Sequence, residues 1–134
     1  MTAPIYTGSA SKVLLAELEV AEIQFLLGQL NMVRIGPNTI TDKRDLLKEI
    51  EKVGKQGYAT SFRERLPEGA SMSVPIKGYI TPVALSVLGS YNRFSNKVMM
   101  DILKEMKRSA TRITSRLSES RQWGERIERQ LSHP

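Results

Sequence analysis

The sequence lacks cysteine altogether and contains a single histidine. Without cysteine, it offers no disulfide, thiolate nucleophile, iron–sulfur cluster or cysteine zinc site. His133 stands one residue from the end, where a histidine is usually a solvated tail residue, so histidine-based triads and most metal sites are excluded as well. We therefore expect no bound metal and no cofactor.

The sequence also has no long apolar run. None approaches the roughly 18–20 residues that a membrane-spanning helix needs, and no basic and apolar leader precedes a small-residue cleavage site. These absences predict a cytoplasmic protein with no membrane partner.

Common catalytic and phosphate-binding patterns are missing too. The nine glycines form neither GxxxxGKS, GxxxxGKT nor GxGxxG. Two carboxylate pairs, Glu17 with Glu19 and Glu49 with Glu51, are spaced i, i+2, so on a helix they do not face each other and make poor catalytic dyads. We therefore predict that the chain is not an enzyme, and we name no catalytic residue.

The overall composition fits one globular domain. The chain has 134 residues, of which 40% are hydrophobic and 25% charged. The net charge is +6, with most of the basic excess in residues 94–134. Arg108, Arg112 and Arg116 follow one another at four-residue steps and form a basic ridge, either a solvated helix face or a phosphate contact.

Helical periodicity dominates the first half of the chain. Residues 9–30 predict one bent helix or two short ones with a break at Gly28, and the buried face is defined by Leu14, Leu18, Ala21 and Phe25 and widened by Leu15 and Ile23. A further helix is expected over residues 43–56. The residues expected to cap or bury it are Thr41 or Asp42 at its start, Leu46, Leu47, Ile50 and Val53 on its inner face, and Gly57 at its end.

The period then changes to two, which predicts strands over residues 58–62, 71–77 and 80–88. A tight turn at Gly78-Tyr79 joins the last two, and the middle strand is expected to bury one face. A long helical stripe follows from Met99 to Leu117. Ser118–Ser120 is expected to interrupt it before a second short helix or a bent extension.

This order of elements predicts an α+β fold with an antiparallel sheet flanked by helices and a long C-terminal helix. Three strands are thin cover for so many helices, so the sheet is expected to be incomplete or to borrow strands from another chain. We divide the chain into a domain over residues 1–117 and a helical basic tail over residues 118–134.

Two segments contain candidate ligand-binding residues. Ser9 and Ser11 stand at a predicted helix start, where free N–H groups favour an anion, although Ser9 acting only as a helix cap is the simpler interpretation. Arg63 and Arg65 lie on a charged loop beside the strands, where they can clamp a carboxylate or remain solvated.

Five blocks, in order over residues 5–93, resemble the sensor domain of IclR-type transcriptional regulators. The blocks are Ile5–Ala16 (IYTGSASKVLLA), Gly36–Asp42 (GPNTITD), Val53–Ala59 (VGKQGYA), Glu64 with Gly69–Ile76 (GASMSVPI), and Val83–Gly89 (VALSVLG). The resemblance implies an incomplete GAF-like domain that binds a small-molecule effector and thereby changes oligomer arrangement and promoter occupancy. In that family a winged helix-turn-helix, absent from this chain, binds the DNA.

Position by position, the resemblance implies a set of effector-binding residues in this chain: Ser9, Ala10, Ser61, Ser71, Ser86 and Leu88. It implies that backbone N–H groups near Ser9 and Ala10 hold an effector carboxylate, that Ser71 and Ser86 add hydroxyl contacts, and that Leu88 lines the apolar side. It also favours a homo-oligomer, a dimer or a tetramer. The alternative is a stand-alone dimerisation or interaction module without DNA-binding or catalytic activity.

Overall fold

The computed structural model describes residues 4–132. Its elements follow the predicted order of helices, then strands, then a final helix. They are α1 (Ser9–Ala16), α2 (Val20–Gln29), α3 (Lys43–Gln56), β1 (Ala59–Phe62), β2 (Gly69–Ile76), β3 (Val83–Ser90), a 3₁₀ turn (Tyr91–Arg93) and α4 (Asn96–Ser132).

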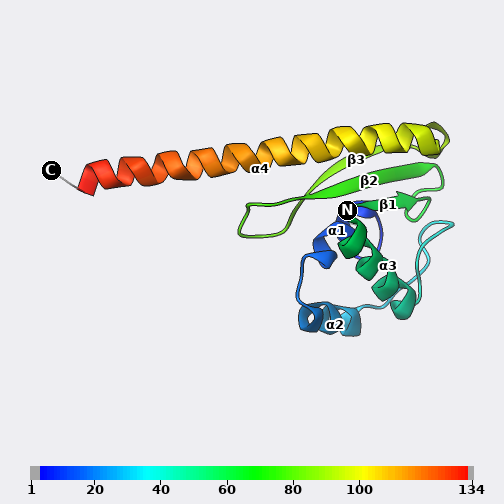
Figure 1. Ribbon diagram of the computed structural model, residues 1–134. Helices are drawn as coiled ribbons and strands as arrows, with labels where there is room; N and C mark the ends of the chain where they lie inside the picture. The colour runs from blue at the N-terminus through cyan, green and yellow to red at the C-terminus, as the bar shows by residue number, and fades with distance from the viewer. Residues whose placement is uncertain (1–3, 133–134) are drawn as a thin grey trace.

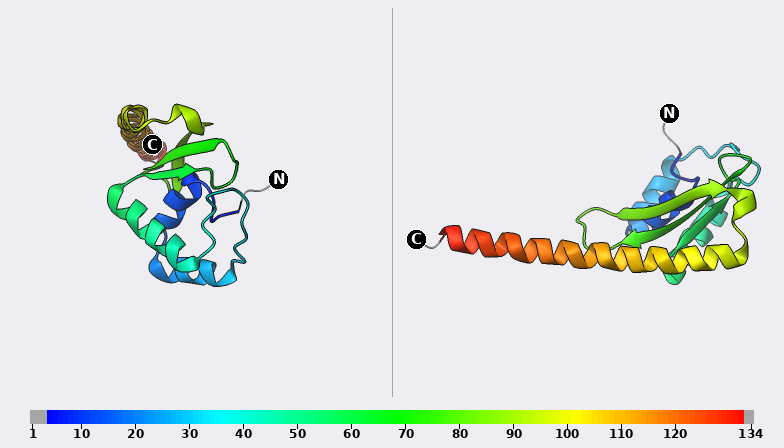
Figure 2. Two further views of the ribbon diagram at one scale, coloured as in Figure 1. Left: turned by 90° about the vertical axis from the view of Figure 1, so that its right-hand side faces the viewer. Right: turned by 90° about the horizontal axis from the view of Figure 1, so that it is seen from above.

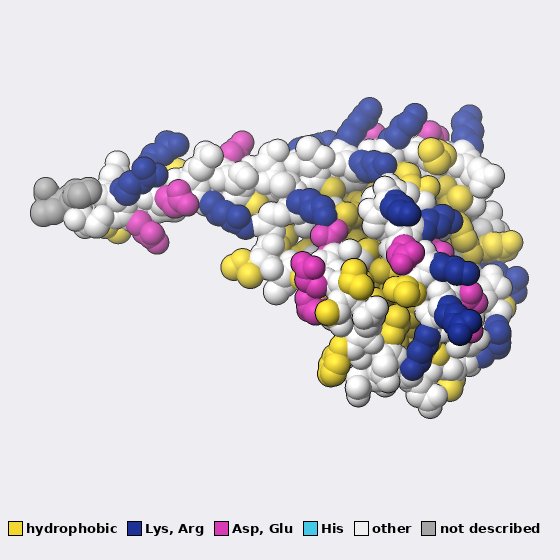
Figure 3. All heavy atoms as spheres, turned by 60° about the horizontal axis from the view of Figure 1, so that its bottom comes forward, with side chains coloured by type: hydrophobic (Ala, Val, Ile, Leu, Met, Phe, Trp, Pro, Cys, Tyr) yellow, Lys and Arg dark blue, Asp and Glu magenta, His cyan; other side chains and the backbone are white. Residues whose placement is uncertain are grey.

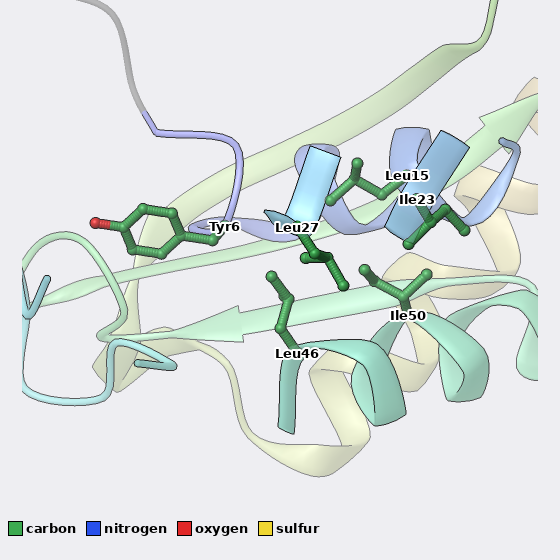
Figure 4. Close-up of a cluster of buried hydrophobic side chains, with 6 residues drawn as sticks. All are labelled: Tyr6, Leu15, Ile23, Leu27, Leu46 and Ile50. Carbon is green, nitrogen blue, oxygen red and sulfur yellow. The ribbon is translucent and has the colours of Figure 1, made fainter. Parts of the chain in front are cut away.

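The elements form layers around an antiparallel sheet with strand order β1-β2-β3, which confirms the predicted α+β class (Figure 1). Helix α4 lies along one face of the sheet, while α1 and α3 cover the other face and α2 lies beyond them (Figures 1 and 2). Side chains of α1, α2 and α3 meet in a core cluster that includes Leu15, Ile23, Leu27, Leu46 and Ile50 (Figure 4). Burial of this cluster is the main force that holds the helical layer together.

The helical segment over residues 9–30 is two helices, but it breaks at residues 17–19 and not at the predicted Gly28. The break changes the phase of the buried face. Ile23 is buried as predicted and Leu27 is buried with it, whereas Ala21 is exposed and Phe25 is 68% exposed, so the prediction was wrong for these two residues of α2. A single helical period cannot describe two helices that meet the core at different angles.

Helix α3 has the predicted bounds and caps. The Asp42 carboxylate accepts hydrogen bonds from the backbone N–H groups of Arg44 and Asp45, so Asp42 is the cap. Gly57 ends the helix with φ 81° and ψ 16°, the left-handed conformation that glycine adopts most readily. These are local signals, and tertiary packing leaves them unchanged.

The strands begin and end close to their predicted positions, with two differences. The connection between β2 and β3 spans residues 77–82 and is wider than the predicted tight turn, although Gly78 has φ 102°. Strand β2 is central and buries residues on both faces, not one: Met72 and Val74 pack beneath α4, and Ser73 is fully buried on the opposite face. Its serines suggested a solvent-facing side, yet their hydroxyls are satisfied inside the protein.

The outer edge of β1 is protected by side chains from the helical layer and the loop after it. Gln56 donates to the carbonyl of Tyr58, Lys12 to that of Thr60, and Asn38 to that of Phe62. Such capping blocks an edge strand from pairing with another chain.

Helix α4 is continuous from Asn96 to Ser132, so the predicted interruption at Ser118–Ser120 was wrong. Serine costs a helix only a fraction of a kcal/mol, about 0.5 relative to alanine, and no proline or glycine accompanies it there. The helix extends well past the sheet (Figure 1).

Candidate functional site

A small hollow of about 120 Å³ opens where the start of α1 meets one end of the sheet. The segments around it are the turn before α1, strand β1, the loop after β1, and the facing ends of β2 and β3. The lining residues are Gly8, Ser61, Glu64, Arg65, Leu66, Gly69, Ala70, Ser71, Leu88 and Gly89. The walls therefore combine apolar leucines with hydroxyls and two opposite charges.

Three of the six predicted site residues, Ser61, Ser71 and Leu88, line this hollow together. Strand register explains their proximity, because Ser71 is the Cα partner of both Ser61 and Leu88. Ser9 and Ser86 lie behind the hollow and do not line it, and neither does the half-buried Ala10.

A chain of hydroxyl groups links these predicted residues across the sheet. The Ser9 Oγ donates to the Ser71 Oγ at 2.7 Å and lies 2.7 Å from the Ser73 Oγ. The Ser73 Oγ in turn lies 2.6 Å from the Ser86 Oγ. Ser71 and Ser86 are thus the two ends of the chain, and of its four members only Ser71 lines the hollow.

Ser9 is not the cap of α1. The N-cap is Gly8, and α1 has no side-chain cap. The Ser9 side chain points instead into the sheet, where it is 1% exposed. The backbone N–H of Ser9 donates to the Ser71 Oγ at 3.4 Å, and that of Gly8 donates to the Glu64 Oε1 at 3.4 Å. An incoming carboxylate therefore has to compete with acceptors of the protein itself.

A buried ion pair underlies the hollow: Glu64 lines its floor, and Lys12, which does not line the hollow, pairs with Glu64. The Lys12 Nζ lies 2.6 Å from the Glu64 Oε2, and it also donates to the Thr60 carbonyl at 3.0 Å and to Glu49 at 3.5 Å. Lys12 and Glu64 are 2% and 6% exposed. Because the pair neutralises its own charges, the floor is polar without being strongly acidic or basic.

Neither member of this pair was predicted from the sequence to be a site residue. Both stand in the blocks that carry the family resemblance, but a lysine and a glutamate on a helix or a loop usually indicate solvent exposure. The one signal in the sequence was spacing from the predicted site residues: Lys12 follows Ser9 by three residues, and Glu64 follows Ser61 by three.

The two loop arginines have different surroundings. The Arg63 Nε donates to the Pro67 carbonyl at 2.7 Å, and its guanidinium lies 5.5 Å from the centre of the Tyr91 ring, so it stabilises the loop. Arg65 is exposed at the rim of the hollow and forms no ion pair among the residues that the structure describes. Arg65 therefore leaves the rim positively charged.

The backbone of Glu64 is held by the turn that contains Gly36. The Thr39 hydroxyl donates to the Glu64 carbonyl and also closes the turn on Gly36. A Cβ added at Gly36 would lie 2.7 Å from the backbone carbonyl carbon of Glu64, closer than any normal contact. Glycine at this position is what allows the turn to approach Glu64.

We accordingly expect Gly36→Ala to destabilise the protein by about 1–3 kcal/mol, the usual cost of overpacking a rigid site. Gly54→Ala is the matched control, since nothing lies within 4 Å of the added Cβ and the position is helical. That control should stabilise the protein by up to about 1 kcal/mol. Urea unfolding followed by circular dichroism measures both, and equal effects of the two variants would contradict the close approach at Gly36.

Within residues 4–132, no group of three histidine, cysteine, aspartate or glutamate side chains is placed to hold a metal ion. In the same part of the chain, no helix is both long enough and apolar enough to cross a membrane. The arrangement instead suits a small polar ligand: hydroxyls on one wall, leucines on another and a cationic rim.

An antiparallel sheet packed between helices, with a polar hollow at one end, defines the α+β domain that holds the candidate site. Residues 1–115 match the family described as Bacterial transcriptional regulator IclR C-terminal. The chain therefore belongs to this family.

Individual relatives agree with this assignment. The chain is 29% identical over 116 residues to the HTH-type transcriptional regulator KipR of Bacillus subtilis (strain 168), covering 85% of this chain and 46% of that protein. A putative transcriptional regulator, RHA06195 from Rhodococcus sp. RHA1, superposes with a TM-score of 0.83 at 28% identity, covering 87% and 49% of the two chains. For the C-terminal domain of the E. coli transcriptional regulator KdgR, the TM-score is 0.78 at 25% identity, covering 85% and 71%. The chain thus spans about half the length of the curated relative that it matches.

Proposed function

We propose that this chain is the effector-sensing domain of an IclR-type transcriptional regulator, and that its effector is a small organic acid bound in the hollow at the start of α1. The observation that carries the proposal is the charge balance of the hollow. The buried Lys12 neutralises Glu64, which lines the hollow, so the guanidinium of Arg65 at the rim is left to attract an anion.

The walls define the rest of the ligand. Ser61 and Ser71 offer hydroxyls, while Leu66 and Leu88 offer apolar surface for a short carbon skeleton. The volume of about 120 Å³ is small beside the roughly 300–1,000 Å³ of sites for drug-sized ligands. The predicted direct contacts of Ser9, Ala10 and Ser86 would require the hydroxyl chain to open, and in this proposal Ser9 and Ser86 support Ser71.

Solved structures with this fold support a small acid as the ligand class. One is a double mutant of the inducer-binding domain of the PobR transcription factor from Acinetobacter, in complex with 3-hydroxybenzoic acid, at 24% identity. Another is an IclR homologue from Microbacterium hydrocarbonoxydans in complex with 4-hydroxybenzoate, at 20% identity. At these identities the likeness is one of fold, so the probes should include both aliphatic and aromatic acids.

The test is the melting temperature of the chain against a panel of small aliphatic and aromatic carboxylates at low and moderate salt. A ligand present at about 100 times its Kd adds about 2.7 kcal/mol to the free energy of unfolding, which is a visible shift. We expect a selective shift for one class of acid, and a reduced shift in Ser71→Ala and in Arg65→Gln.

Arg44→Gln is the control for Arg65→Gln, because Arg44 is equally exposed but lies on α3, where its side chain does not line the hollow. It should leave the shift unchanged. A cooperative melt with no shift from any acid, or a shift that Arg65→Gln and Ser71→Ala both preserve, would contradict the proposed site.

The hollow joins the start of α1 to the ends of two strands, so a ligand there can change how these elements pack. In the whole regulator, we propose that this change alters the arrangement of dimers or tetramers in the cytoplasm and thereby promoter occupancy, with DNA bound by a winged helix-turn-helix outside this sequence. A stand-alone interaction module remains the second candidate, and the observation that favours it is the part of α4 that projects past the sheet.

A further inference from the structure

The last part of α4, residues 118–132, projects beyond the sheet as a single helix, and we call it the α4 tail (Figures 1 and 2). It lies outside the residues 1–115 that match the family. It carries three arginines and three glutamates, so it is neutral and not basic as predicted; Figure 3 shows the two kinds of charge interspersed along it.

A heptad stripe continues through α4 without a change of phase. Its first members, including Leu103, Met106 and Ala110, are buried against the sheet. Steps of three and four residues extend the same stripe into the tail. Its members there are Ser120, Gly124, Ile127 and Leu131. The stripe that packs on the sheet in one half of the helix thus faces solvent in the other half.

The exposed half carries more apolar surface than a solvated helix needs. Leu131 is 81% exposed and Trp123 is 65% exposed. Gly124 has nothing within 4 Å of the position that a Cβ would occupy, so the middle of the stripe is an open depression. Along the stripe, Ser120 and Gly124 are small, whereas Ile127 and Leu131 are large. A second tail that runs antiparallel can therefore set its large residues against the small ones of the first.

We propose that the α4 tail pairs antiparallel with the α4 tail of a second copy of this chain. In the proposed register, Gly124 lies opposite the partner's Ile127, and Ser120 lies opposite the partner's Leu131. Each layer therefore pairs a small residue with a large one, and two-fold symmetry repeats both layers. The side chain of Ile127 then enters the depression at Gly124.

Charge complementarity selects the same register. It sets Arg121 beside the partner's Glu128 on one flank of the stripe, twice by symmetry, and Trp123 beside the partner's Gln130 on the other. Shifting the antiparallel pair by one heptad would set Arg121 against the partner's Arg121. A parallel pair would set Arg116 against the partner's Arg121 and would leave Gly124 facing a second glycine.

The contact is short, because 15 residues of helix at 1.5 Å each span only about 22 Å. We therefore expect a reversible dimer with a Kd on the order of 10–100 µM, as for a small transient interface. The proposal does not depend on the effector site, since the tail lies away from the hollow.

Sedimentation equilibrium of the full chain from about 5 to 500 µM tests the proposal. The mass should rise from 15.1 kDa toward twice that value. Trp123 is the only tryptophan of the chain, so its emission should shift to shorter wavelength over the same range. Arg121→Glu should raise the Kd at least about tenfold, because it opposes two pairs of like charges. Arg121→Glu combined with Glu128→Arg should restore the Kd.

Arg129→Glu is the matched control. By heptad spacing, Arg129 lies on the side of the helix opposite the stripe, and like Arg121 it is four residues from Glu125. Both reversals therefore create the same like-charge pair within their own helix, and circular dichroism checks that helix content is equal. Gly124→Gln, which fills the depression with a better helix former, should also weaken the dimer.

Three results would overturn the proposal. The first is a chain that stays monomeric throughout the concentration range. The second is a dimer that responds to Arg121→Glu no more than to Arg129→Glu, which would place the contact on another face such as β3. The third is a double charge swap that fails to restore association, which would exclude this register.

Discussion

Replacing Lys12 with methionine should lower the free energy of unfolding by about 3–5 kcal/mol, the largest single-residue effect that we expect in this chain. The lysine is 2% exposed, and its Nζ lies 2.6 Å from Glu64. Methionine keeps most of the apolar volume of the side chain but leaves the Glu64 carboxylate buried without its counter-charge. Urea unfolding at neutral pH, followed by circular dichroism, measures the loss.

The chain supplies a control with the same chemistry at its surface. Lys77 also lies 2.6 Å from a carboxylate, that of Glu17, but it is 64% exposed. Water and salt screen this pair, so Lys77→Met should cost only about 0–1 kcal/mol. The two ion pairs have the same distance and differ in burial, but Lys12→Met also removes the donor to the Thr60 carbonyl, so the comparison reports charge burial together with that lost hydrogen bond.

A double variant separates lost charge compensation from lost packing. Lys12→Met combined with Glu64→Leu removes both charges, and replacing a buried pair with apolar side chains is often neutral or stabilising. The double variant should recover much of the loss, although Gly8 N–H then lacks the Glu64 acceptor. If Lys12→Met costs no more than Lys77→Met, or the double variant is less stable than the single one, Lys12 does not compensate a buried charge.

Much of the fold could be predicted because its signals are local. The cap at Asp42, the left-handed Gly57 and the apolar spacing between them fix α3 wherever it packs. The alternation in β2 and β3 fixes two strands in the same way. The hairpins follow from the short connections between strands, which favour antiparallel pairing.

The site could be predicted only in part, because its geometry depends on contacts between distant segments. Strand register brings Ser61, Ser71 and Leu88 to one end of the sheet, and these three residues were predicted from the family resemblance and not from the strand pattern. The inward direction of Ser9 and the burial of Lys12 were not predictable in the same way. Both result from the position of α1 between the sheet and α3, which buries side chains around most of the helix.

Helix α2 offers the clearest test of where pattern and structure disagree. The predicted stripe placed both Phe25 and Ile23 on the buried face, whereas the structure exposes Phe25 by 68% and buries Ile23, which is 6% exposed. The break at residues 17–19 reorients α2, so that Ile23 and Leu27 meet Leu46 and Ile50 of α3 (Figure 4).

Ile23→Ala should therefore cost about 2–5 kcal/mol, the range for removing most of a buried aliphatic side chain and leaving a cavity. Phe25→Ala removes more atoms, yet it should change stability by only about 0.5 kcal/mol or less, because surface substitutions rarely do more. Both variants retain helix propensity or improve it, so a shift in the urea midpoint at constant slope reports packing alone. If Phe25 instead packed in the core as the stripe predicted, Phe25→Ala would cost about 3–5 kcal/mol, at least as much as Ile23→Ala. A loss confined to Ile23→Ala therefore shows that α2 turns Ile23 toward the core and Phe25 away from it.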